Sequence, residues 1–272
     1  MFQRKFKIME KDFWQKQYYD LASKYGKDDS DWKVKKALDY LVSDLKPGEK
    51  ILEVGCGTAD FAGKLSEKIF YTGIDISDYA LDDAKRRFLG KNNCSFIKAE
   101  ADKLPFRDEE FESVLAKFGL EHFSKPRESL LEIARVLKLG GSLIIIAPNL
   151  EFPFCFPTAY RHKGFLFRLK LYFLRSYDYI MRLLDRYHFR VLKDNYLSAT
   201  GRYEKKDDDL VYLVSSFEVI NFLKNIGFEF VFFNKFKPDK KARKELIKKM
   251  ITYLPGMKYY GTELFIIAKK NA

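Results

Sequence analysis

The stretch Ile51–Asp60, ILEVGCGTAD, carries the strongest pattern in this 272-residue chain. Its apolar start predicts a short buried strand, which breaks at Gly55-Cys56-Gly57 before a segment expected to be helical. Two glycines this close together allow a sharp turn and leave no Cβ in the way of a ligand. The first amides of the expected helix would then point toward that ligand. The stretch therefore predicts a binding turn at the end of a strand.

A second acidic strand end indicates which ligand the turn binds. Tyr71–Ile74 runs into Asp75, whose carboxylate can accept hydrogen bonds from both hydroxyls of a ribose. A dinucleotide fingerprint requires a third glycine at position 60, but that residue is Asp60, which would repel two phosphates. Glu53 adds another negative charge before the turn. These residues favour S-adenosyl-L-methionine, which has a ribose, no phosphate and two cationic groups.

These motifs resemble those of a known family over about a hundred residues. Glu53–Gly57 (EVGCG) and Gly73–Asp75 (GID) closely resemble motifs I and II of class I S-adenosylmethionine-dependent methyltransferases. Phe96–Phe106 is similar to the third strand and adenine loop of that family. Phe111–Lys117 resembles the fourth strand, and Leu120–Phe123 the short motif after it. The whole is most similar to the methyltransferases of quinone biosynthesis and their small-molecule relatives.

The resemblance implies individual roles around the cofactor. Glu100 would accept from the adenine amino group, and the amide of Ala101 would donate to the ring. The backbone of Lys117 would touch the methionine part, and Tyr25 would close over it as a lid. A plain packing role for Tyr25 fits the helical periodicity equally well. The expected cofactor-binding residues are Tyr25, Glu53, Gly55, Cys56, Gly57, Asp75, Ile76, Glu100, Ala101 and Lys117.

The resemblance also implies an α/β fold. We expect a Rossmann-like doubly wound sheet of seven strands in the order 3-2-1-4-5-7-6, with the last strand antiparallel and a helical cap inserted. The expected parts are an N-terminal helical lid (1–45), a cofactor-binding core (46–149), an aromatic and basic cap (150–215), and a C-terminal helix with two strands (216–272).

Local signals place several elements within these parts. Ser124 and Pro126 predict a capped helix start, and Gly140-Gly141 predicts its end, before a fifth strand at Leu143–Ala147. A periodic helix is expected at Ser216–Ile226, and the two final strands at 228–236 and 262–269. Residues 10–45 have a helical pattern with one interruption near Gly26.

The cap combines basic and aromatic residues in a pattern that predicts an amphipathic helix. Four arginines recur every seven residues and form one slowly drifting stripe: Arg161, Arg168, Arg175 and Arg182. Apolar residues form the opposite side: Leu166, Leu169, Phe173, Ile180 and Leu184. Asp178 has the helical spacing to pair with Arg175 and Arg182. Two interpretations remain: a helix packed on the core with a solvated basic face, or an interfacial helix with its apolar side among lipid headgroups.

Composition bounds the partners and the compartment. Fifty Lys and Arg against 38 Asp and Glu give a net charge of +12, which favours an anionic partner, although a salt-screened surface also explains it. A second basic run, 237–249, fits either a polybasic patch or a solvated charge run. Three scattered cysteines favour a reducing cytoplasm. No signal-peptide core or spanning segment is evident. We expect a cytoplasmic protein with a peripheral contact to an anionic membrane, and rank nucleic acid lower.

Methyl transfer requires in-line placement of the acceptor, and a base where the acceptor must lose a proton. Glu121 and His122 are the first candidates for that base, ahead of His162 and His188. In the family, the Glu-His pair often shapes only the floor of the site, and this structural role is the default expectation. No metal site is expected, because the histidines and cysteines have no ligand spacing.

These features predict methyl transfer to a small-molecule or lipid- or glycan-linked acceptor, at oxygen. Lys117-Phe118-Gly119 lacks the Pro-Pro-aromatic motif of nucleobase amino methylation, and Cys155 lacks the context of a cytosine-C5 nucleophile. Two alternatives stay open. One is methylation of RNA or protein through the basic surface, and the other is binding of S-adenosylmethionine without catalysis.

Overall fold

The structure, a computed structural model, describes residues 31–151, 156–184, 186–200, 202, 204, 208–233 and 263–272. Within them one sheet contains β1 (Lys50–Val54), β2 (Phe70–Asp75), β3 (Cys94–Lys98), β4 (Phe111–Lys117), β5 (Leu137–Ala147), β6 (Phe228–Phe233) and β7 (Leu264–Lys270). The strand order is 3-2-1-4-5-7-6. Strands β1 to β5 are parallel, and β7 is antiparallel to both of its neighbours. The predicted fold and strand order are confirmed.

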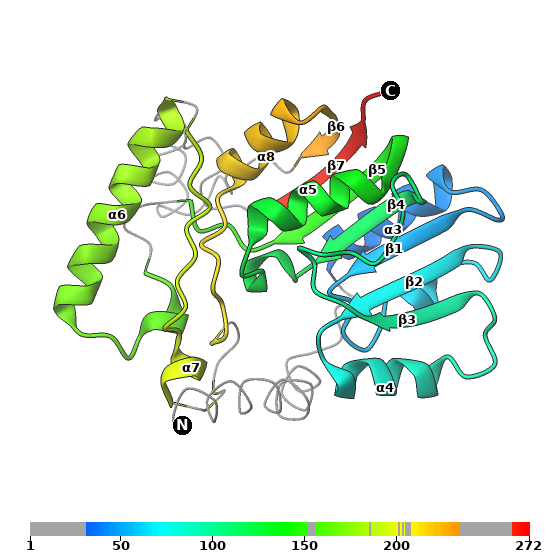
Figure 1. Cartoon of the computed structure of the whole chain (residues 1–272), viewed down its shortest axis with the longest axis horizontal. Coiled ribbons are helices and arrows are strands. Elements are labelled where there is room, and N and C mark those ends of the chain that lie inside the picture. The colour runs from blue at the N-terminus through cyan, green and yellow to red at the C-terminus, as the bar shows by residue number, and fades with distance from the viewer. Residues whose placement is uncertain are drawn as a thin grey trace, which may run out of the picture.

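Helices cover both faces of this sheet (Figure 1). Successive strand residues point to opposite faces, so Leu52 packs with α5 (Pro126–Val136) and α8 (Ser216–Asn225). Its neighbour Ile51 packs with α3 (Trp32–Asp44) and α4 (Asp78–Arg87) on the other face. Strands buried on both sides explain the continuous apolar runs of the sequence.

Two local predictions were wrong: the helix after the glycine turn and the ends of α5. The glycine turn leads into a short 3-10 helix, η2 (Ala62–Lys64), and not into an α-helix. Ala59, just after the turn, has a φ of 58°, which is incompatible with an α-helix beginning there. Gly63 further weakens helix formation in this segment. The turn therefore presents its own amides rather than the first turn of a long helix.

Helix α5 differs from its predicted ends. Pro126 does occupy the first turn, but the N-cap is Lys125, one residue after the expected Ser124, and its side chain makes no capping hydrogen bond. Its end is Val136, and Gly140 and Gly141 lie inside β5 at a register irregularity against β4. A Cβ on Gly141 would lie 2.8 Å from the carbonyl oxygen of Lys138. Gly141 therefore avoids crowding in the strand, Gly140 has a φ of 73°, which favours glycine, and neither residue ends a helix.

Other predicted elements were found near their expected positions. Helix α8 begins after Ser215, whose side chain accepts from the amide of Glu218. β6 and β7 supply the two final strands within 228–233 and 264–270. Residues 1–30, including Tyr25, lie outside the described residues, as do Cys155 and the basic run 237–249.

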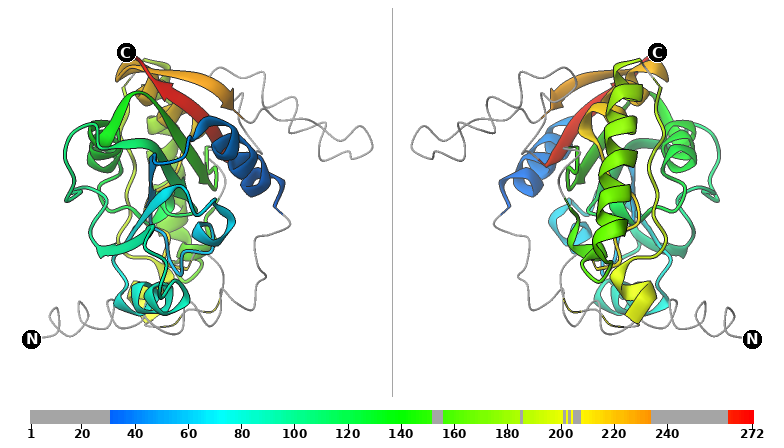
Figure 2. Two further views of the ribbon diagram at one scale, coloured as in Figure 1. Left: turned by 90° about the vertical axis from the view of Figure 1, so that its right-hand side faces the viewer. Right: turned by 90° about the vertical axis from the view of Figure 1, so that its left-hand side faces the viewer.

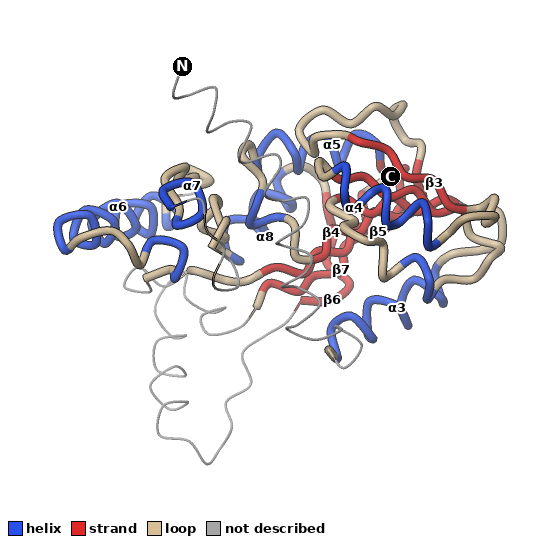
Figure 3. Tube along the Cα trace, turned by 90° about the horizontal axis from the view of Figure 1, so that it is seen from below, coloured by secondary structure: helices blue, strands red, loops and turns tan. Residues whose placement is uncertain are grey.

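The cap lies on the side toward which the carboxyl ends of β1, β2 and β4 point (Figure 1). It contains η4 (Thr158–Tyr160), α6 (Phe165–Leu183) and α7 (Tyr196–Thr200). Figure 3 shows α6 and α7 at one end of the molecule and α3 and α4 at the other. The cap has a small apolar cluster that includes Tyr160, Leu171 and Leu210.

The orientation of α6 differs from the prediction. Arg175 and Arg182 are buried, whereas Leu166 and Phe173 are exposed. A solvated basic face is therefore wrong for these two arginines. Asp178 pairs with Arg190 and not with its predicted helical neighbours, because Arg190 presents a planar donor pair to both carboxylate oxygens.

Candidate functional site

The glycine turn brings the ends of three strands together. Gly55 and Gly57 have φ values of 74° and 54°, the left-handed region that favours glycine. The amides of Gly55 and Cys56 both donate to the carbonyl of Ile74, each at 2.9 Å. A Cβ on Gly55 would lie 3.6 Å from the Cα of Gly119, which follows β4. The missing side chains thus leave the main chain of the turn close to β2 and β4.

Asp75 stands at the end of β2, beside this turn. Its Oδ2 accepts from the amide of Gly57 at 2.9 Å, and its Oδ1 from the amide of Ser77 at 2.9 Å. Burial raises the pKa of Asp75, while these amides and the charge of His122 oppose that rise. An ionised carboxylate has about four lone-pair sites, so each oxygen can still accept from a ligand hydroxyl. The next side chain, Ile76, is 52% exposed and offers an apolar surface beside the carboxylate.

Glu53 is buried directly behind the turn. Its Oε2 accepts a hydrogen bond of 2.5 Å from the hydroxyl of Tyr71. Burial raises the pKa of Glu53 to about 7, against the opposing charge of Lys117 at the end of β4. Burial also raises the pKa of the Cys56 thiol, which therefore stays protonated and is no nucleophile at neutral pH. The charge of Glu53 thus interacts with the charge of Lys117 and with the thiol of Cys56.

The expected adenine loop follows β3. The amide of Ala99 donates to the carbonyl of Asp75 at 3.2 Å, which holds the start of this loop beside the end of β2. Glu100 is exposed, and Ala101 is half-buried. Asp102, which the sequence reasoning did not single out, binds Lys125 at 2.5 Å. Glu100 therefore has a free approach to a ligand lying along the strand ends, and its adenine role stays a prediction.

His122 lies at the end of η3 (Leu120–His122), just after β4. Its Nδ1 lies 2.9 Å from Oδ2 of Asp209, and its Nε2 lies 3.9 Å from Oε1 of Glu121. Asp209 is only 3% exposed, and Glu121 is equally buried. The charge of a protonated His122 lowers the pKa of Asp75, so the two side chains interact electrostatically. The strand ends therefore include an imidazole 2.9 Å from a buried carboxylate.

The cap supplies Asp209, which the sequence reasoning missed. The carbonyl of Glu121 accepts from the amides of Val211 and Tyr212 at 3.1 and 2.9 Å, which ties this cap segment to η3. Asp209 stands within an acidic run, Asp207 to Asp209, and no spacing relates that run to His122. Only a fold that brings the two segments together could have identified the pair.

The two remaining histidine candidates have neighbours within the cap. The ring of His162 packs against Tyr196 with centroids 5.7 Å apart, and burial lowers the pKa of His162. The ring of His188 packs against Tyr177 at 5.5 Å. Both are therefore held by cap aromatics, whereas His122 stands beside Asp75.

The described part of the chain contains neither a group of metal ligands nor a membrane-spanning helix. Among those residues, no three His, Cys, Asp or Glu side chains are grouped as metal ligands. In the same residues, no helix has the length and apolar character needed to cross a bilayer.

The part of the chain from β1 to β5 is similar to known proteins. Residues 52–145 match the family model described as "Methyltransferase domain". The chain is 35% identical over 112 residues to the ubiquinone/menaquinone biosynthesis C-methyltransferase UbiE of Ectopseudomonas mendocina, covering 39% of this chain and 44% of that protein. It is 37% identical over 106 residues to the demethylmenaquinone methyltransferase of Staphylococcus saprophyticus, covering 38% and 46%. The chain thus spans less than half the length of these curated relatives.

A solved structure extends the likeness to the whole fold. The S-adenosylmethionine-dependent methyltransferase from Mesorhizobium loti superposes with a TM-score of 0.56, covering 88% of this chain and 98% of that chain at 16% identity. At this identity, the likeness shows the shared fold alone.

Proposed function

We propose that the chain binds S-adenosyl-L-methionine at the glycine turn and methylates an acceptor beneath the cap, because residues 52–145 match a methyltransferase domain model and are similar to curated methyltransferases. The observation that carries this proposal is Asp75, whose carboxylate is held beside the glycine turn by the amide of Gly57. When bound, the cofactor supplies an electrophilic methyl group on a sulfonium.

The crevice residues fit this cofactor. The spare lone pairs of Asp75 suit a ribose diol, and the exposed side chain of Ile76 suits the face of an adenine. Glu100 and the amide of Ala101 are proposed for the adenine edge. Glu53 and Asp75 give the turn a negative character, which suits the cationic methionine end. The lid role of Tyr25 is proposed from the resemblance alone.

We assign the base to His122, positioned by Asp209. Nδ1 lies 2.9 Å from Oδ2 of Asp209 without the alignment of a hydrogen bond, so the carboxylate acts on the ring through its charge, and Nε2 can accept a proton from the acceptor. The buried carboxylate then stabilises the imidazolium that forms. This geometry favours an acid–base role over a purely structural Glu121-His122 pair. A hydroxyl acceptor must lose its proton on methylation, which supports O-methylation of a small-molecule or lipid- or glycan-linked substrate.

A second candidate reaction is methylation at carbon. The relatives named above include a C-methyltransferase, and an acceptor carbon also loses a proton when it gains a methyl group. The same base would serve both reactions. Product analysis by mass spectrometry and NMR after incubation with cell extract separates an O-methyl from a C-methyl product.

Cofactor binding is tested by isothermal titration with S-adenosylmethionine. Asp75→Ala removes the charged acceptor of the ribose hydroxyls and should weaken binding by about 1.5–3 kcal/mol, or about 10- to 150-fold. Asp82→Ala removes a carboxylate that is 65% exposed on α4 and should leave affinity unchanged. Equal affinity in Asp75→Ala and wild type would refute the ribose assignment, and tighter binding of NAD would refute the cofactor.

Catalysis is tested with the two residues of the base. His122→Ala should lower kcat by roughly two to four orders of magnitude with cofactor affinity intact. Asp209→Asn should lower kcat, with a smaller change in KM, because the amide cannot stabilise an imidazolium. Asp194→Asn alters a cap carboxylate that is 83% exposed and serves as the control. A loss of less than tenfold in His122→Ala would return the residue to a structural role.

A further inference from the structure

Helix α6 turns its charged side inward and its apolar side to solvent. Arg175, Asp178 and Arg182 are 4%, 6% and 7% exposed. Eight large apolar side chains of α6 and its C-cap are between 40% and 79% exposed: Phe165, Leu166, Leu169, Phe173, Tyr177, Ile180, Leu183 and Leu184. We call these eight residues the apolar strip. Positions 166, 169, 173, 177, 180 and 184 are three or four apart, so they share one face of the helix.

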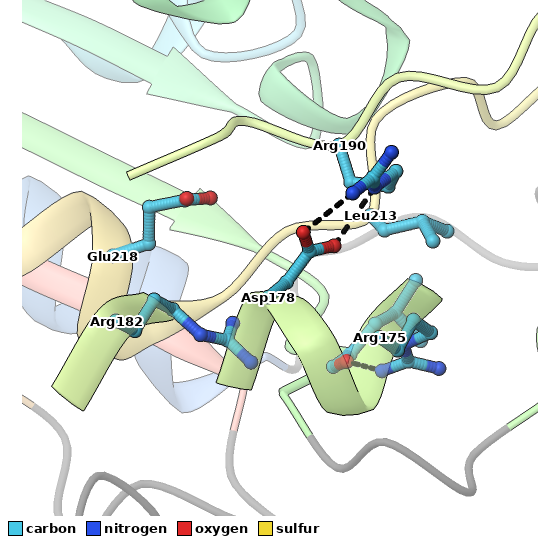
Figure 4. Close-up of a pocket in the computed structure, with 7 residues that line it drawn as sticks. Arg175, Asp178, Arg182, Arg190, Leu213 and Glu218 are labelled. Carbon is cyan, nitrogen blue, oxygen red and sulfur yellow. Dashed lines mark hydrogen bonds and ion pairs between the residues drawn. The ribbon is translucent and has the colours of Figure 1, made fainter. Parts of the chain in front are cut away.

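The buried side of α6 is held by charge-assisted hydrogen bonds (Figure 4). Asp178 accepts two bonds from Arg190, from Nε at 2.8 Å and Nη2 at 2.5 Å. Arg175 donates to the carbonyl of Leu150. Arg182 lines the same pocket as Glu218. Rolling α6 to bury the apolar strip would carry Asp178 away and leave the half-buried guanidinium of Arg190 without its partner, which is unfavourable.

Glu218 anchors this cluster to the rest of the fold. Its Oε1 accepts from the amides of His188 and Phe189 at 2.8 and 3.0 Å, and its Oε2 from the hydroxyl of Tyr212 at 3.0 Å. Because α8 carries Glu218 and packs on the sheet, the inward side of α6 is set by the domain itself. The apolar strip therefore faces outward as a stable feature of the structure.

The strip lies on an accessible, elongated surface. Figure 2 (right) shows α6 running lengthwise along the outer face of its end of the molecule. Nineteen residues make a helix about 28 Å long. Contiguous exposed apolar surface of this kind marks an interaction site. A straight, protruding helix suits a flat partner.

The charged residues on and beside α6 indicate what kind of partner the strip binds. Asp178 is the only acidic residue of α6, and it is buried. The exposed cation Lys170 flanks the strip near its start, Arg186 lies beyond its end, and Arg168 is exposed on the opposite side of the helix. We propose that α6 docks on an anionic lipid surface, with the strip at the boundary between headgroups and acyl chains and the cations among the phosphates.

A second copy of the chain fits this surface less well. Two antiparallel α6 helices in contact through the strip would bring Lys170 of one copy toward Arg186 of the other. Two parallel helices would oppose Lys170 with Lys170. Neither arrangement gives these cations an acidic residue of α6 to pair with, because Asp178 is occupied by Arg190. Charge complementarity therefore favours an anionic bilayer.

The proposal is tested by co-sedimentation of the full chain with phosphatidylcholine vesicles, with and without phosphatidylglycerol. The wild type should pellet with the anionic vesicles, less with the neutral ones, and be released as salt rises. Changing Leu169, Phe173 and Ile180 together to Glu should lower vesicle binding at least about 30-fold, because each apolar side chain contributes on burial. The control changes Val42 and Leu89, which are 63% and 86% exposed elsewhere, to Glu and should bind as wild type does.

A second variant separates charge from apolar contact. Lys170→Gln with Arg186→Gln should weaken binding to anionic vesicles about 30-fold, at about fivefold per cation, and leave binding to neutral vesicles unchanged. The buried arginines are unsuitable for this test, because their removal would disturb the fold. An unchanged circular dichroism spectrum and unfolding midpoint in every variant show an intact domain and keep this result independent of the proposed function.

Three outcomes would overturn the proposal. The first is a wild-type chain that pellets with neither kind of vesicle. The second is equal loss of binding in the strip variant and in the Val42 and Leu89 control. The third is a wild-type dimer in light scattering that the strip variant abolishes, which would assign the strip to a second copy of the chain.

Discussion

Charged side chains are buried both at the ends of β1 and β2 and in the cap around α6. The two regions differ in where their apolar residues lie. In the crevice, apolar strand residues fill the core and the charges of Glu53 and Asp75 gather where the strands end. In the cap, the charges of Arg175 and Asp178 are on the inside, and apolar residues cover the outside. The pattern of apolar residues therefore predicts that a helix forms, but its partners decide which side is buried.

The largest effect should come from breaking the buried charge cluster of the cap. Asp178→Ala removes the carboxylate that accepts two hydrogen bonds from the guanidinium of Arg190. The change should lower the free energy of unfolding by about 3–5 kcal/mol. Urea denaturation followed by circular dichroism measures this change. Asp82→Ala, which alters an exposed carboxylate, should change it by less than about 0.5 kcal/mol. A loss below about 1 kcal/mol in Asp178→Ala would show that the cluster does not hold α6.

The next effect concerns the buried charge of the crevice and depends on pH. The pKa of Glu53 is about 7 in the folded protein against a usual value of 4.5. The folded state therefore binds more protons than the unfolded state between these values, and stability falls as pH rises through that window. The full difference amounts to about 3 kcal/mol. Glu53→Gln should thus gain stability relative to wild type between pH 5 and pH 8.

Denaturation of Glu53→Gln and wild type at several pH values measures that difference. Glu229→Gln, at an exposed site on β6, is the matched control and should follow the wild-type curve. Parallel curves for Glu53→Gln and wild type would mean that the carboxyl group titrates normally, as a solvated one does.

The smallest effect probes packing under the glycine turn. A Cβ on Gly73 would lie 2.8 Å from Sγ of Cys56, so Gly73→Ala should lower the free energy of unfolding by about 1–3 kcal/mol. Cys56→Ala removes the sulfur, and the double variant should recover part of the loss. A double-mutant cycle from denaturation curves measures this coupling. Strict additivity of the two changes would show that the contact is relieved without the sulfur moving.

Much of the core was predictable because its signals are local. The glycine spacing at 55 and 57, the acidic end of β2 at Asp75 and the apolar strand runs each depend on the conformation of a few neighbouring residues. The strand order came from the resemblance, and the structure confirmed it. Where a local signal had two meanings, as in Gly140-Gly141, the prediction was wrong. A glycine pair marks a helix end and a strand irregularity equally well.

The amino-acid sequence by itself determined where the glycine turn and the amphipathic helix of the cap form, because backbone turns and helical periodicity are encoded within short segments. Tertiary structure alone decided that Asp209 meets His122, and that Arg190 meets Asp178 and so turns the apolar strip outward. Such pairs arise because a buried charge must find a partner, and the partner can come from any segment that the fold brings near. Proximity of this kind has no periodicity along the chain.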